Sequence, residues 1–403
     1  MRRDDDSPPI DIEVLDAGPT GDAGDARRPI WQWLARVLAA GLATAVVATV
    51  IVRADNEPSA ARATHAPVGA QASSGEFDES SQPSSTVPPM PAVAVTEMGH
   101  PLLDVTGGWE LFGRGDEAVI RIQLALGRIT RTTVAAAQSS GPVSFIAVAD
   151  GAIIRPLDYV PGYVIPDGQP ARDMSARLSD GGPVFPGPDL NHIWVESGDN
   201  GHMTMVLASL DGRVRQQSIP VPEGMFPVAD GAGYLLLVGA HGVDDARGGR
   251  LHRISTGSLL AVGPTGWLAV ECDRQHQCAT VAIQRADDSR HVIGSAVDVD
   301  ESPGVISPNG VTAAVFNTGP AGTVTLSLIT LNSGRQQPVD VDLNPRQLDG
   351  AIVWSPDGRW LFAATINGSL TAINADTGGV TDLGTPLPPL SQLAIRDVPP
   401  KRR

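Results

Sequence analysis

The sequence contains few basic and few aromatic residues. Lys401 is its only lysine, Lys and Arg together number 29 against 45 Asp and Glu, and the formal net charge is −16. Nucleic-acid binding depends on clustered Lys and Arg that neutralise phosphates, so we expect no nucleic-acid partner. Solubility alone explains an acidic surface of this kind. Aromatic residues make up only 4 %, whereas Gly (44) and Pro (34) are abundant, which favours short strands and turns over long helices.

Common catalytic and cofactor motifs are also absent from the sequence. The eight histidines are scattered without H-E-x-x-H spacing, and no G-x-S-x-G, P-loop or dinucleotide-binding glycine pattern occurs. Acidic pairs such as Asp244-Asp245 fall in predicted loops, where carboxylates are usually solvated. The stretch DVDE at 298–301 offers oxygen ligands for Ca²⁺ but no complete ligand loop. We therefore expect no cofactor, and we assign no metal ligand and no catalytic residue.

The two cysteines, Cys272 and Cys278, flank the sequence DRQHQ. A strand-and-turn pattern that recurs over residues 101–398 places Cys272 at the end of one strand and Cys278 at the start of the next. In an oxidising compartment, two such thiols form a disulfide when their Cα atoms come within about 6 Å. Zinc is the alternative, but it needs four ligands and His276 supplies only one more. We expect the disulfide.

A membrane anchor is predicted near the N-terminus. Residues 30–53 contain the apolar run IWQWLARVLAAGLATAVVATVIV, which as a helix would span the roughly 30 Å of bilayer hydrocarbon. Arginines before or early in this segment outnumber those after it, with Arg27, Arg28 and Arg36 against Arg53. The positive-inside rule therefore places the acidic, disordered tail 1–29 in the cytoplasm, the helix in the cytoplasmic (inner) membrane and the rest outside. A cleaved signal peptide is the alternative, because the residues around Arg53 resemble a cleavage site.

The rest of the chain divides into a linker and a repetitive region. Residues 54–100 are rich in Ser, Pro, Ala and Gln and predict a flexible linker. A strand-and-turn pattern then recurs over residues 101–398, and its clearest copy predicts strands at 352–354, 360–366, 369–374 and 380–383. About seven units recur at a spacing of roughly 41 residues, which is typical of propeller blades. We predict an all-β fold, a β-propeller of about seven four-stranded blades, with an irregular β-sandwich as the alternative.

The first of these units lacks its own first strand. The C-terminal stretch SQLAIRDV at 391–398 alternates in polarity like a strand and has no other predicted partner. We predict that it returns to complete the first blade, because a ring closed in this way has no open sheet edge.

Two tryptophans flank the turn in VWSPDGRW, at 353–360. Ser at the first position, Pro at the second and Gly at the fourth are typical of a type I turn, so we interpret the serine and aspartate as turn residues and not as a nucleophile and its acid. A second copy, SPNG, occurs earlier. The two turns comprise Ser355, Pro356, Asp357 and Gly358, and Ser307, Pro308, Asn309 and Gly310.

The WSPDG element resembles the WD40-like repeat of TolB-type β-propellers, in which this phrase lies between the first two strands of a blade. The resemblance extends over residues 102–398, although other units depart from the phrase (PGPDLN, ADGAG and PTG). It implies a propeller fold but no particular activity, because propellers include enzymes, receptors and scaffolds.

A binding surface is expected at one end of the ring. Loops between the second and third strands of each blade, and loops between blades, share that end, and loops on a rigid scaffold commonly carry function. The candidate residues on this rim are Asp199, His202, Asp244, Asp245, Arg274 and His276.

Taken together, the sequence favours a membrane-anchored, extracytoplasmic binding or scaffolding module whose partner is an envelope protein or a polysaccharide. The alternative is a propeller enzyme, a hydrolase or lyase acting on an envelope glycan or lactone. Catalysis would require acids or histidines that converge on the central channel. A third hypothesis is a sensor whose tail, residues 1–29, binds a cytoplasmic partner.

Overall fold

The structure is a computed structural model that describes residues 92–105, 107–134, 142–157, 162–174, 178, 182–199, 202–295, 302–319, 322–383, 385 and 387–397. These residues form strands and short 3-10 turns, such as Leu124–Leu126 and Arg247–Gly249. No helix among them has both the length and the apolar character needed to cross a membrane. The predicted tail, the predicted membrane segment and the linker up to residue 91 lie outside the described residues.

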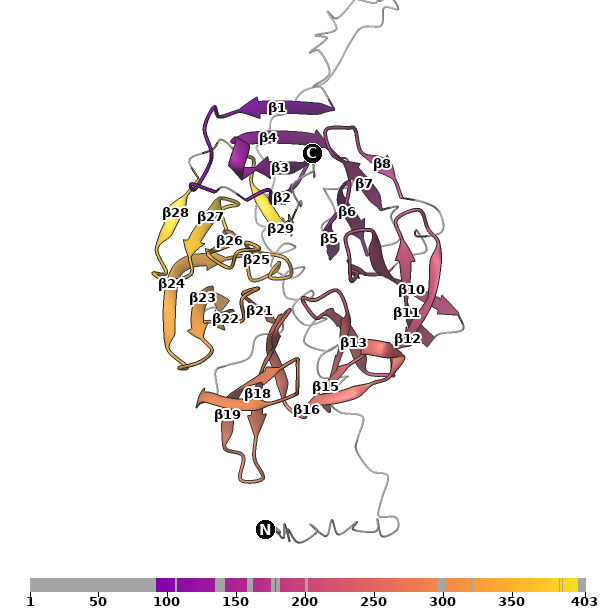
Figure 1. The fold of residues 1–403 in the computed structure, drawn as a ribbon, viewed down its shortest axis with the longest axis vertical. Helices are drawn as coiled ribbons and strands as arrows, with labels where there is room; N and C mark the ends of the chain where they lie inside the picture. The colour runs from indigo at the N-terminus through magenta and orange to yellow at the C-terminus, as the bar shows by residue number, and fades with distance from the viewer. Residues whose placement is uncertain are drawn as a thin grey trace, which may run out of the picture. The chain divides into compact units, whose positions relative to one another are not determined.

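The described strands form six sheets, and Figure 1 shows them arranged around a ring. One sheet has five strands in the order β1 (Val93–Glu97), β4 (Arg128–Thr133), β3 (Ala118–Gln123), β2 (Glu110–Gly115) and β29 (Leu390–Arg396). Four sheets are four-stranded meanders in chain order: β5 (Val143–Val148), β6 (Gly151–Pro156), β7 (Tyr163–Pro166) and β8 (Arg172–Asp173); β9 (Val184–Pro186), β10 (His192–Asp199), β11 (His202–Ser209) and β12 (Val214–Pro220); β13 (Met225–Ala229), β14 (Leu235–Gly239), β15 (Gly242–Asp245) and β16 (His252–Ser255); and β25 (Ile352–Trp354), β26 (Trp360–Ala364), β27 (Leu370–Asn374) and β28 (Val380–Asp382).

The sixth sheet has eight strands, so the sheet count differs from the predicted seven. It joins two antiparallel meanders, β17 (Ser258–Gly263), β18 (Gly266–Cys272), β19 (Cys278–Gln284) and β20 (Arg290–Ser295), and β21 (Gly304–Ile306), β22 (Thr312–Thr318), β23 (Val324–Thr330) and β24 (Gln336–Leu343). The join is a short parallel pairing of β17 with β21, in which Ala261 lies opposite Gly304 and Val262 opposite Val305. Two innermost strands approach closely enough here to share backbone hydrogen bonds, which spacing along the sequence does not predict.

Buried apolar side chains hold neighbouring meanders together. Seven core clusters each join two meanders that are consecutive around the ring. One of them combines Leu260 of β17 with Ile306 of β21, and another combines Phe362 of β26 with Leu111 of β2, so the last meander packs against the first. Because alternate residues of a strand point to opposite faces, each sheet contributes apolar side chains to the cluster on either side of it.

The C-terminal strand closes the ring, as the sequence predicts. β29 pairs antiparallel with β2, with Glu110 opposite Arg396 and Leu111 opposite Ile395. Leu390 and Leu393 of the same strand are buried in the cluster that joins the last meander to the first sheet. The two ends of the domain are therefore paired within one sheet, and Figure 1 places β29 beside β2.

The first sheet begins earlier than the predicted domain start at residue 101. Strand β1, at Val93–Glu97, adds to the outer edge of this sheet by pairing with β4. Its side chains are largely exposed, and an ion pair between Glu97 and Arg128 spans the pairing. Backbone hydrogen bonds explain why a segment of linker-like composition becomes a strand, because they do not depend on side-chain type.

Strand bounds in the clearest repeat follow the prediction closely. β25 matches the predicted 352–354, β26 begins at Trp360 but ends at Ala364, and β27 and β28 end at Asn374 and Asp382. The hairpin between β26 and β27 contains an Asn-Gly pair, which is typical of a type I′ turn with positive φ at two residues. Gly368 has a φ of +77°, Asn367 is not in this region, and the N–H of Gly368 donates to the carbonyl of Thr365. The longer connection therefore accommodates a turn with a single left-handed glycine.

Candidate functional site

The tryptophan-flanked SPDG turn, at 355–358, is stabilised by hydrogen bonds of its own side chains. The buried Oγ of Ser355 accepts a hydrogen bond from the backbone N–H of Trp360 at 2.9 Å and donates to Oδ1 of Asp357 at 2.5 Å. The N–H of Gly358 donates to the carbonyl of Ser355, and its φ of +69° is readily adopted by glycine. Pro356 occupies the second position, where its fixed φ suits the turn.

The second turn repeats this arrangement with asparagine in place of aspartate. Ser307 Oγ bonds to Oδ1 of Asn309 at 2.7 Å and accepts the backbone N–H of Thr312, and Gly310 N–H donates to the Ser307 carbonyl. In both turns the serine hydroxyl donates to a turn residue and not to a base. Their side chains organise the connection between the first two strands of a meander.

The disulfide between Cys272 and Cys278 is present in the structure. The two residues are register partners at the ends of β18 and β19, and their Cα atoms lie 3.9 Å apart. The bond therefore closes the exposed loop that connects these strands.

Replacing both cysteines by serine, Cys272→Ser with Cys278→Ser, is expected to lower the free energy of unfolding by about 2 kcal/mol or less, because the closed loop is short. Denaturant unfolding of the oxidised protein and the double variant measures this difference. The reduced wild type is the control, and it should behave like the variant and gain two hydrogens in its intact mass. Two free thiols in protein isolated without reductant would contradict the assignment.

Four of the six predicted rim residues lie at connections of the expected kind. Asp199 and His202 are register partners at the ends of β10 and β11, and Arg274 and His276 are exposed in the disulfide loop between β18 and β19. These connections belong to different sheets that are not consecutive in the ring. The structure does not bring the four residues together into one site.

Asp244 and Asp245 are placed differently from the prediction. They lie in strand β15 and not in a loop, at the end that leads to β16, which is the opposite end of the sheet from the predicted rim. Both are buried, and they form ion pairs with Arg253 and Arg247 respectively. Pairing with arginine allows the two carboxylates to be buried within the strand. The sequence here lacks the alternation of polar and apolar residues that indicates a strand, so it predicted a loop.

Three cavities lie at that opposite end, where the first strand of a meander turns into the second and the third into the fourth. The Arg335 cavity, of about 280 Å³, lies between β21–β24 and the loop after β27. The His192 cavity, of about 530 Å³, is lined by Asp150 after β5 and by residues of β9–β12. The Trp109 cavity, of about 380 Å³, lies between the turn after β25 and the segment that leads into β2. At the other end of the ring, where the binding surface was expected, a cavity of about 150 Å³ is lined by residues that include Asn367, Gly368, Leu387 and Pro389.

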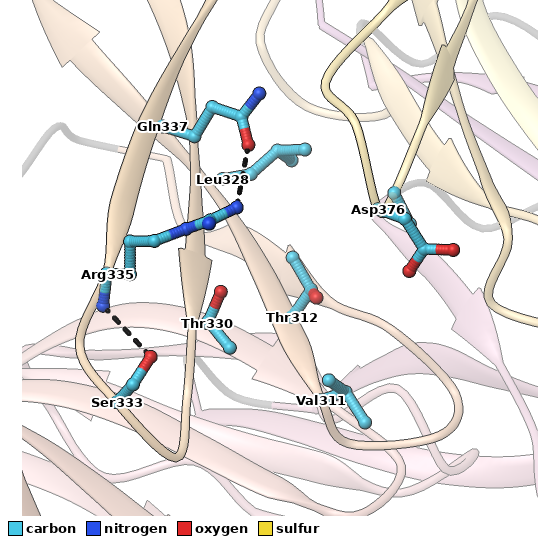
Figure 2. A pocket seen from close by; sticks show the side chains of 9 residues that line it. Val311, Thr312, Leu328, Thr330, Ser333, Arg335, Gln337 and Asp376 are labelled. Atoms are coloured by element: carbon cyan, nitrogen blue, oxygen red, sulfur yellow. Dashed lines mark hydrogen bonds between the residues drawn. The ribbon is translucent and has the colours of Figure 1, made fainter.

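The Arg335 cavity is shown in Figure 2. The guanidinium of Arg335 lies against Gln337, to whose Oε1 it donates at 3.3 Å, and Asp376 lines the cavity from another meander. Thr312 and Thr330 present hydroxyl groups between them. Gln337 also donates to the backbone carbonyl of Thr377. The cavity is thus lined by polar groups, some of which already bond to one another.

His192, which lines the His192 cavity, forms a hydrogen bond with Asp189. Nδ1 of the buried His192 lies 2.7 Å from Oδ1 of Asp189, and this hydrogen bond is the main cause that lowers the pKa of the Asp189 carboxyl. Ser209 is the register partner of His192 on the neighbouring strand. Ser209 Oγ, however, bonds to Asp211, in the same manner as the serines of the SPDG and SPNG turns. A serine, a histidine and an aspartate are therefore adjacent, but the serine donates to a carboxylate and not to the histidine.

The Trp109 cavity combines tryptophans with charged side chains. Its lining includes Trp109 and Trp360, the carboxylates of Asp104, Asp357 and Asp397, and the guanidinium of Arg359. The acids come from three separate parts of the chain: the approach to β2, the turn after β25 and the end of β29. No local sequence signal could have found this set, because folding alone brings these segments together.

A buried ionic network lies between the first two sheets. Arg396 of β29 pairs with Glu110 of β2 and with Asp167 after β7, and Arg121 of β3 pairs with the same two acids. The side chain of Arg396 is 2 % exposed, and its other terminal nitrogen donates to the carbonyls of Val148 and Ala149. The network therefore ties the closing strand to the second sheet.

The charge of Glu110 is stabilised by its arginine partners. Burial by itself would raise the pKa of this carboxyl, but the hydrogen bonds and positive charges of Arg121 and Arg396 together lower it below its ordinary value.

A second charged contact across sheets occurs where Arg285 bonds to the fully buried Asp230 and lies over the ring of Trp267 at 4.8 Å. Both arrangements serve packing between sheets.

Asp349 lies beside the innermost strands of the ring. Its backbone carbonyl accepts a hydrogen bond from Nε2 of Gln392 on β29, which also donates to the carbonyl of Val143 on β5. Desolvation raises the pKa of the Asp349 carboxyl even though the residue remains in contact with solvent. A carboxyl group reached by water but surrounded by protein on several sides fits a position at the inner strands. No pattern in the sequence indicated a special role for Asp349.

No group of three or more His, Cys, Asp or Glu side chains in the described ranges is placed to bind a metal ion. The acidic stretch 298–301 lies outside those ranges.

The chain is similar in structure to solved propeller proteins. No family model and no curated protein sequence matches the chain. TolB from Acinetobacter baumannii is 14 % identical, with a TM-score of 0.40, over 75 % of this chain and 82 % of that one. The periplasmic gluconolactonase PpgL from Pseudomonas aeruginosa is 15 % identical (TM-score 0.42; 72 % and 99 %), and AztD from Citrobacter koseri is 13 % identical (TM-score 0.44; 74 % and 100 %). These similarities assign neither a ligand nor an activity.

Proposed function

We propose that this protein is a single-pass membrane protein that displays an extracytoplasmic β-propeller as a binding module for an envelope polysaccharide or protein. Residues 30–53 form the membrane span, with residues 1–29 in the cytoplasm. The disulfide between Cys272 and Cys278 is consistent with an oxidising compartment.

The observation that carries the proposal is the set of cavities between consecutive meanders at one end of the ring. The Arg335, His192 and Trp109 cavities share that end and present polar side chains to solvent. The meanders that form their walls are fixed by buried clusters and by contacts such as the Arg396 network. A rigid scaffold with several adjacent polar cavities favours recognition of an extended ligand, because little conformational entropy is lost on binding.

Hydrolysis is the second candidate function, and one observation favours it. His192 and Ser209 line the His192 cavity, and Asp189 forms a hydrogen bond with His192. Catalysis would require the Ser209 hydroxyl to leave Asp211 and donate to the histidine. Turnover of a panel of lactones and glycosides by the wild type, lost in Ser209→Ala, would establish this function over simple binding.

Membrane orientation can be tested with single cysteines, because the two natural cysteines are joined to each other. Ser7→Cys and Ser85→Cys form a matched pair on either side of the proposed span. In intact cells a membrane-impermeant thiol reagent is expected to label Ser85→Cys and to label Ser7→Cys only after permeabilisation. Labelling of both, or of Ser7→Cys alone, would contradict the orientation.

The binding function itself is tested by crosslinking the tagged full-length protein in intact cells and identifying the captured material. We expect an envelope polysaccharide or protein to be recovered reproducibly. Recovery of neither, with turnover of a glycan or lactone by the purified protein, would replace binding by catalysis.

A further inference from the structure

We propose that the Trp109 cavity binds a hexosamine sugar whose amine is free and protonated, as one unit of an envelope polysaccharide. The proposal rests on the binding function above and names the class of ligand that this cavity accepts. Its volume of about 380 Å³ lies in the lower part of the range of small-molecule sites.

The indole N–H of Trp109 has no acceptor among the described residues. Trp109 is only 4 % exposed and lines the cavity, yet no described residue accepts a hydrogen bond from its Nε1. The buried Trp194 and Trp354 differ, because each donates to a backbone carbonyl at 3.0 Å. A Cβ at Gly107 would lie 2.7 Å from Nε1 of Trp109, so a side chain there would crowd this edge of the indole. The geometry leaves the N–H for an oxygen brought by a ligand.

Negatively charged side chains predominate in the lining of the Trp109 cavity. Asp104 and Asp397 are exposed and form no ion pair with any described residue, and Asp357 uses one of its oxygens within its turn. Arg359 is the single cation among the lining residues, against three carboxylates. The His192 cavity, in contrast, has Arg213 and Arg215 beside its acids. The Trp109 cavity therefore favours a ligand that carries positive charge and disfavours uronic acids and phosphates.

The segment that leads into β2 has a strained backbone. Leu103 and Asp104 both have left-handed φ, +56° and +51°, which is uncommon for residues other than glycine. The flanking Leu102 and Val105 are buried, and they are fixed by hydrogen bonds of the Leu102 N–H to Leu124 and of the Val105 N–H to Leu102. The strained pair is therefore held in place by packing, which fixes the backbone that carries the Asp104 carboxylate at the cavity.

These features together match an amino sugar. Ring and hydroxyl oxygens can accept the indole N–H, hydroxyl groups can donate to carboxylates, and the apolar face of the sugar can pack against tryptophan. A protonated amine adds a charge-assisted hydrogen bond to a carboxylate, which is stronger than a neutral one. An acetylated amine would lose this interaction.

The test is calorimetric titration of the full-length protein in detergent with a β-1,4-linked glucosamine tetramer, its N-acetylated counterpart and a galacturonate tetramer. The glucosamine tetramer is expected to bind at least about tenfold more tightly than the other two. Asp104→Asn and Asp397→Asn should each weaken its binding about tenfold, and Trp109→Phe about 3- to 10-fold. Asn tolerates left-handed φ, so Asp104→Asn preserves the backbone at that position.

Asp340→Asn, at an exposed position of β24 that lines none of the three cavities, is the matched control and should leave the affinity unchanged. Melting curves of all variants establish that each is folded. Equal or tighter binding of the acetylated or galacturonate tetramer, or unchanged binding by both Asp104→Asn and Asp397→Asn, would overturn the proposal. A lysine peptide that competes at the same site with equal affinity would overturn the assignment to a sugar.

Failure of this site and failure of the proposed function give different results. If the wild type and Asp104→Asn capture the same polysaccharide equally in cells, the binding function stands and the site is wrong. If the purified protein binds the glucosamine tetramer with the expected effects of the variants but captures nothing in cells, the site stands and the proposed function is wrong.

Discussion

Removal of residues 390–403 is expected to leave the propeller domain without a cooperative unfolding transition. The deletion removes β29, which supplies Leu390 and Leu393 to the cluster that joins the last meander to the first sheet, and leaves β2 with an unpaired edge. Burial of each leucine contributes about 1.5–3 kcal/mol. The ionic contacts of Arg396 add about 3–5 kcal/mol. Domains typically have a net stability of only about 5–15 kcal/mol, so the open ring falls near or below the threshold for folding.

Circular dichroism during heating and limited proteolysis measure this result. The matched control ends at Asp397, which keeps β29 and removes only residues 398–403. This shorter truncation should melt like the full-length chain. Leu393→Ala provides a graded second test, because truncation of a buried leucine costs about 2–5 kcal/mol. An unchanged melting curve for the longer deletion would show that β29 does not close the ring.

Arg396→Met is expected to destabilise the domain by about 3–5 kcal/mol, because removing one partner of a buried ion pair leaves the other partner's charge uncompensated. Here the acids left behind are Glu110 and Asp167, although Arg121 still contacts both. For a domain of this size the loss corresponds to a fall in melting temperature of about 6–15 °C.

Arg128→Met is the matched control for this change. Its ion pair with Glu97 joins two strands of the same sheet, but the side chains are 47 % and 54 % exposed. Exposed pairs contribute about 0–1 kcal/mol, so the control should melt close to the wild type. Equal destabilisation by the two substitutions would mean that the Arg396 network adds nothing beyond a surface contact.

The same network predicts a pH dependence. The folded-state pKa of Glu110 is lowered by Arg121 and Arg396, which outweigh the opposing effect of burial. A carboxyl with a depressed pKa contributes stability that is complete above its unfolded-state pKa of about 4.3 and is lost as the pH falls through the folded-state value. The stability difference between the wild type and Glu110→Gln should therefore be largest at neutral pH and shrink below pH of about 4. Urea midpoints at several pH values measure it, and a pH-independent difference would contradict the assigned cause.

Much of the fold could be predicted from the sequence where local chemistry determines it. The bonds that define the SPDG turn connect residues within five positions of Ser355, so the phrase itself contains them. The alternation of SQLAIRDV similarly indicated a strand, and the absence of a strand at the start of the first unit indicated its partner. The disulfide followed from the closeness of Cys272 and Cys278 in the sequence.

The candidate site could not be predicted in the same way. Asp104, Asp357 and Asp397 reach one cavity only because β29 closes the ring and brings the last meander against the first sheet. Asp244 and Asp245 resembled solvated loop residues, but pairing with Arg253 and Arg247 allows them to be buried in a strand. The merger of two meanders into one sheet depends on a few backbone hydrogen bonds between β17 and β21, for which side-chain pattern gives no signal.

The sequence by itself determined the all-β class, the four-stranded unit, the turn residues, the closing strand and the disulfide. Each depends on neighbours along the chain or on one strongly patterned segment. Only the tertiary structure decided where the cavities lie, which charges are paired and which acids line the Trp109 cavity. Those properties depend on contacts between residues far apart in sequence, such as Glu110 with Arg396 and Trp109 with the turn at Asp357. These properties depend on the distances between side chains across packed interfaces, and such distances cannot be read from short stretches of a single sequence.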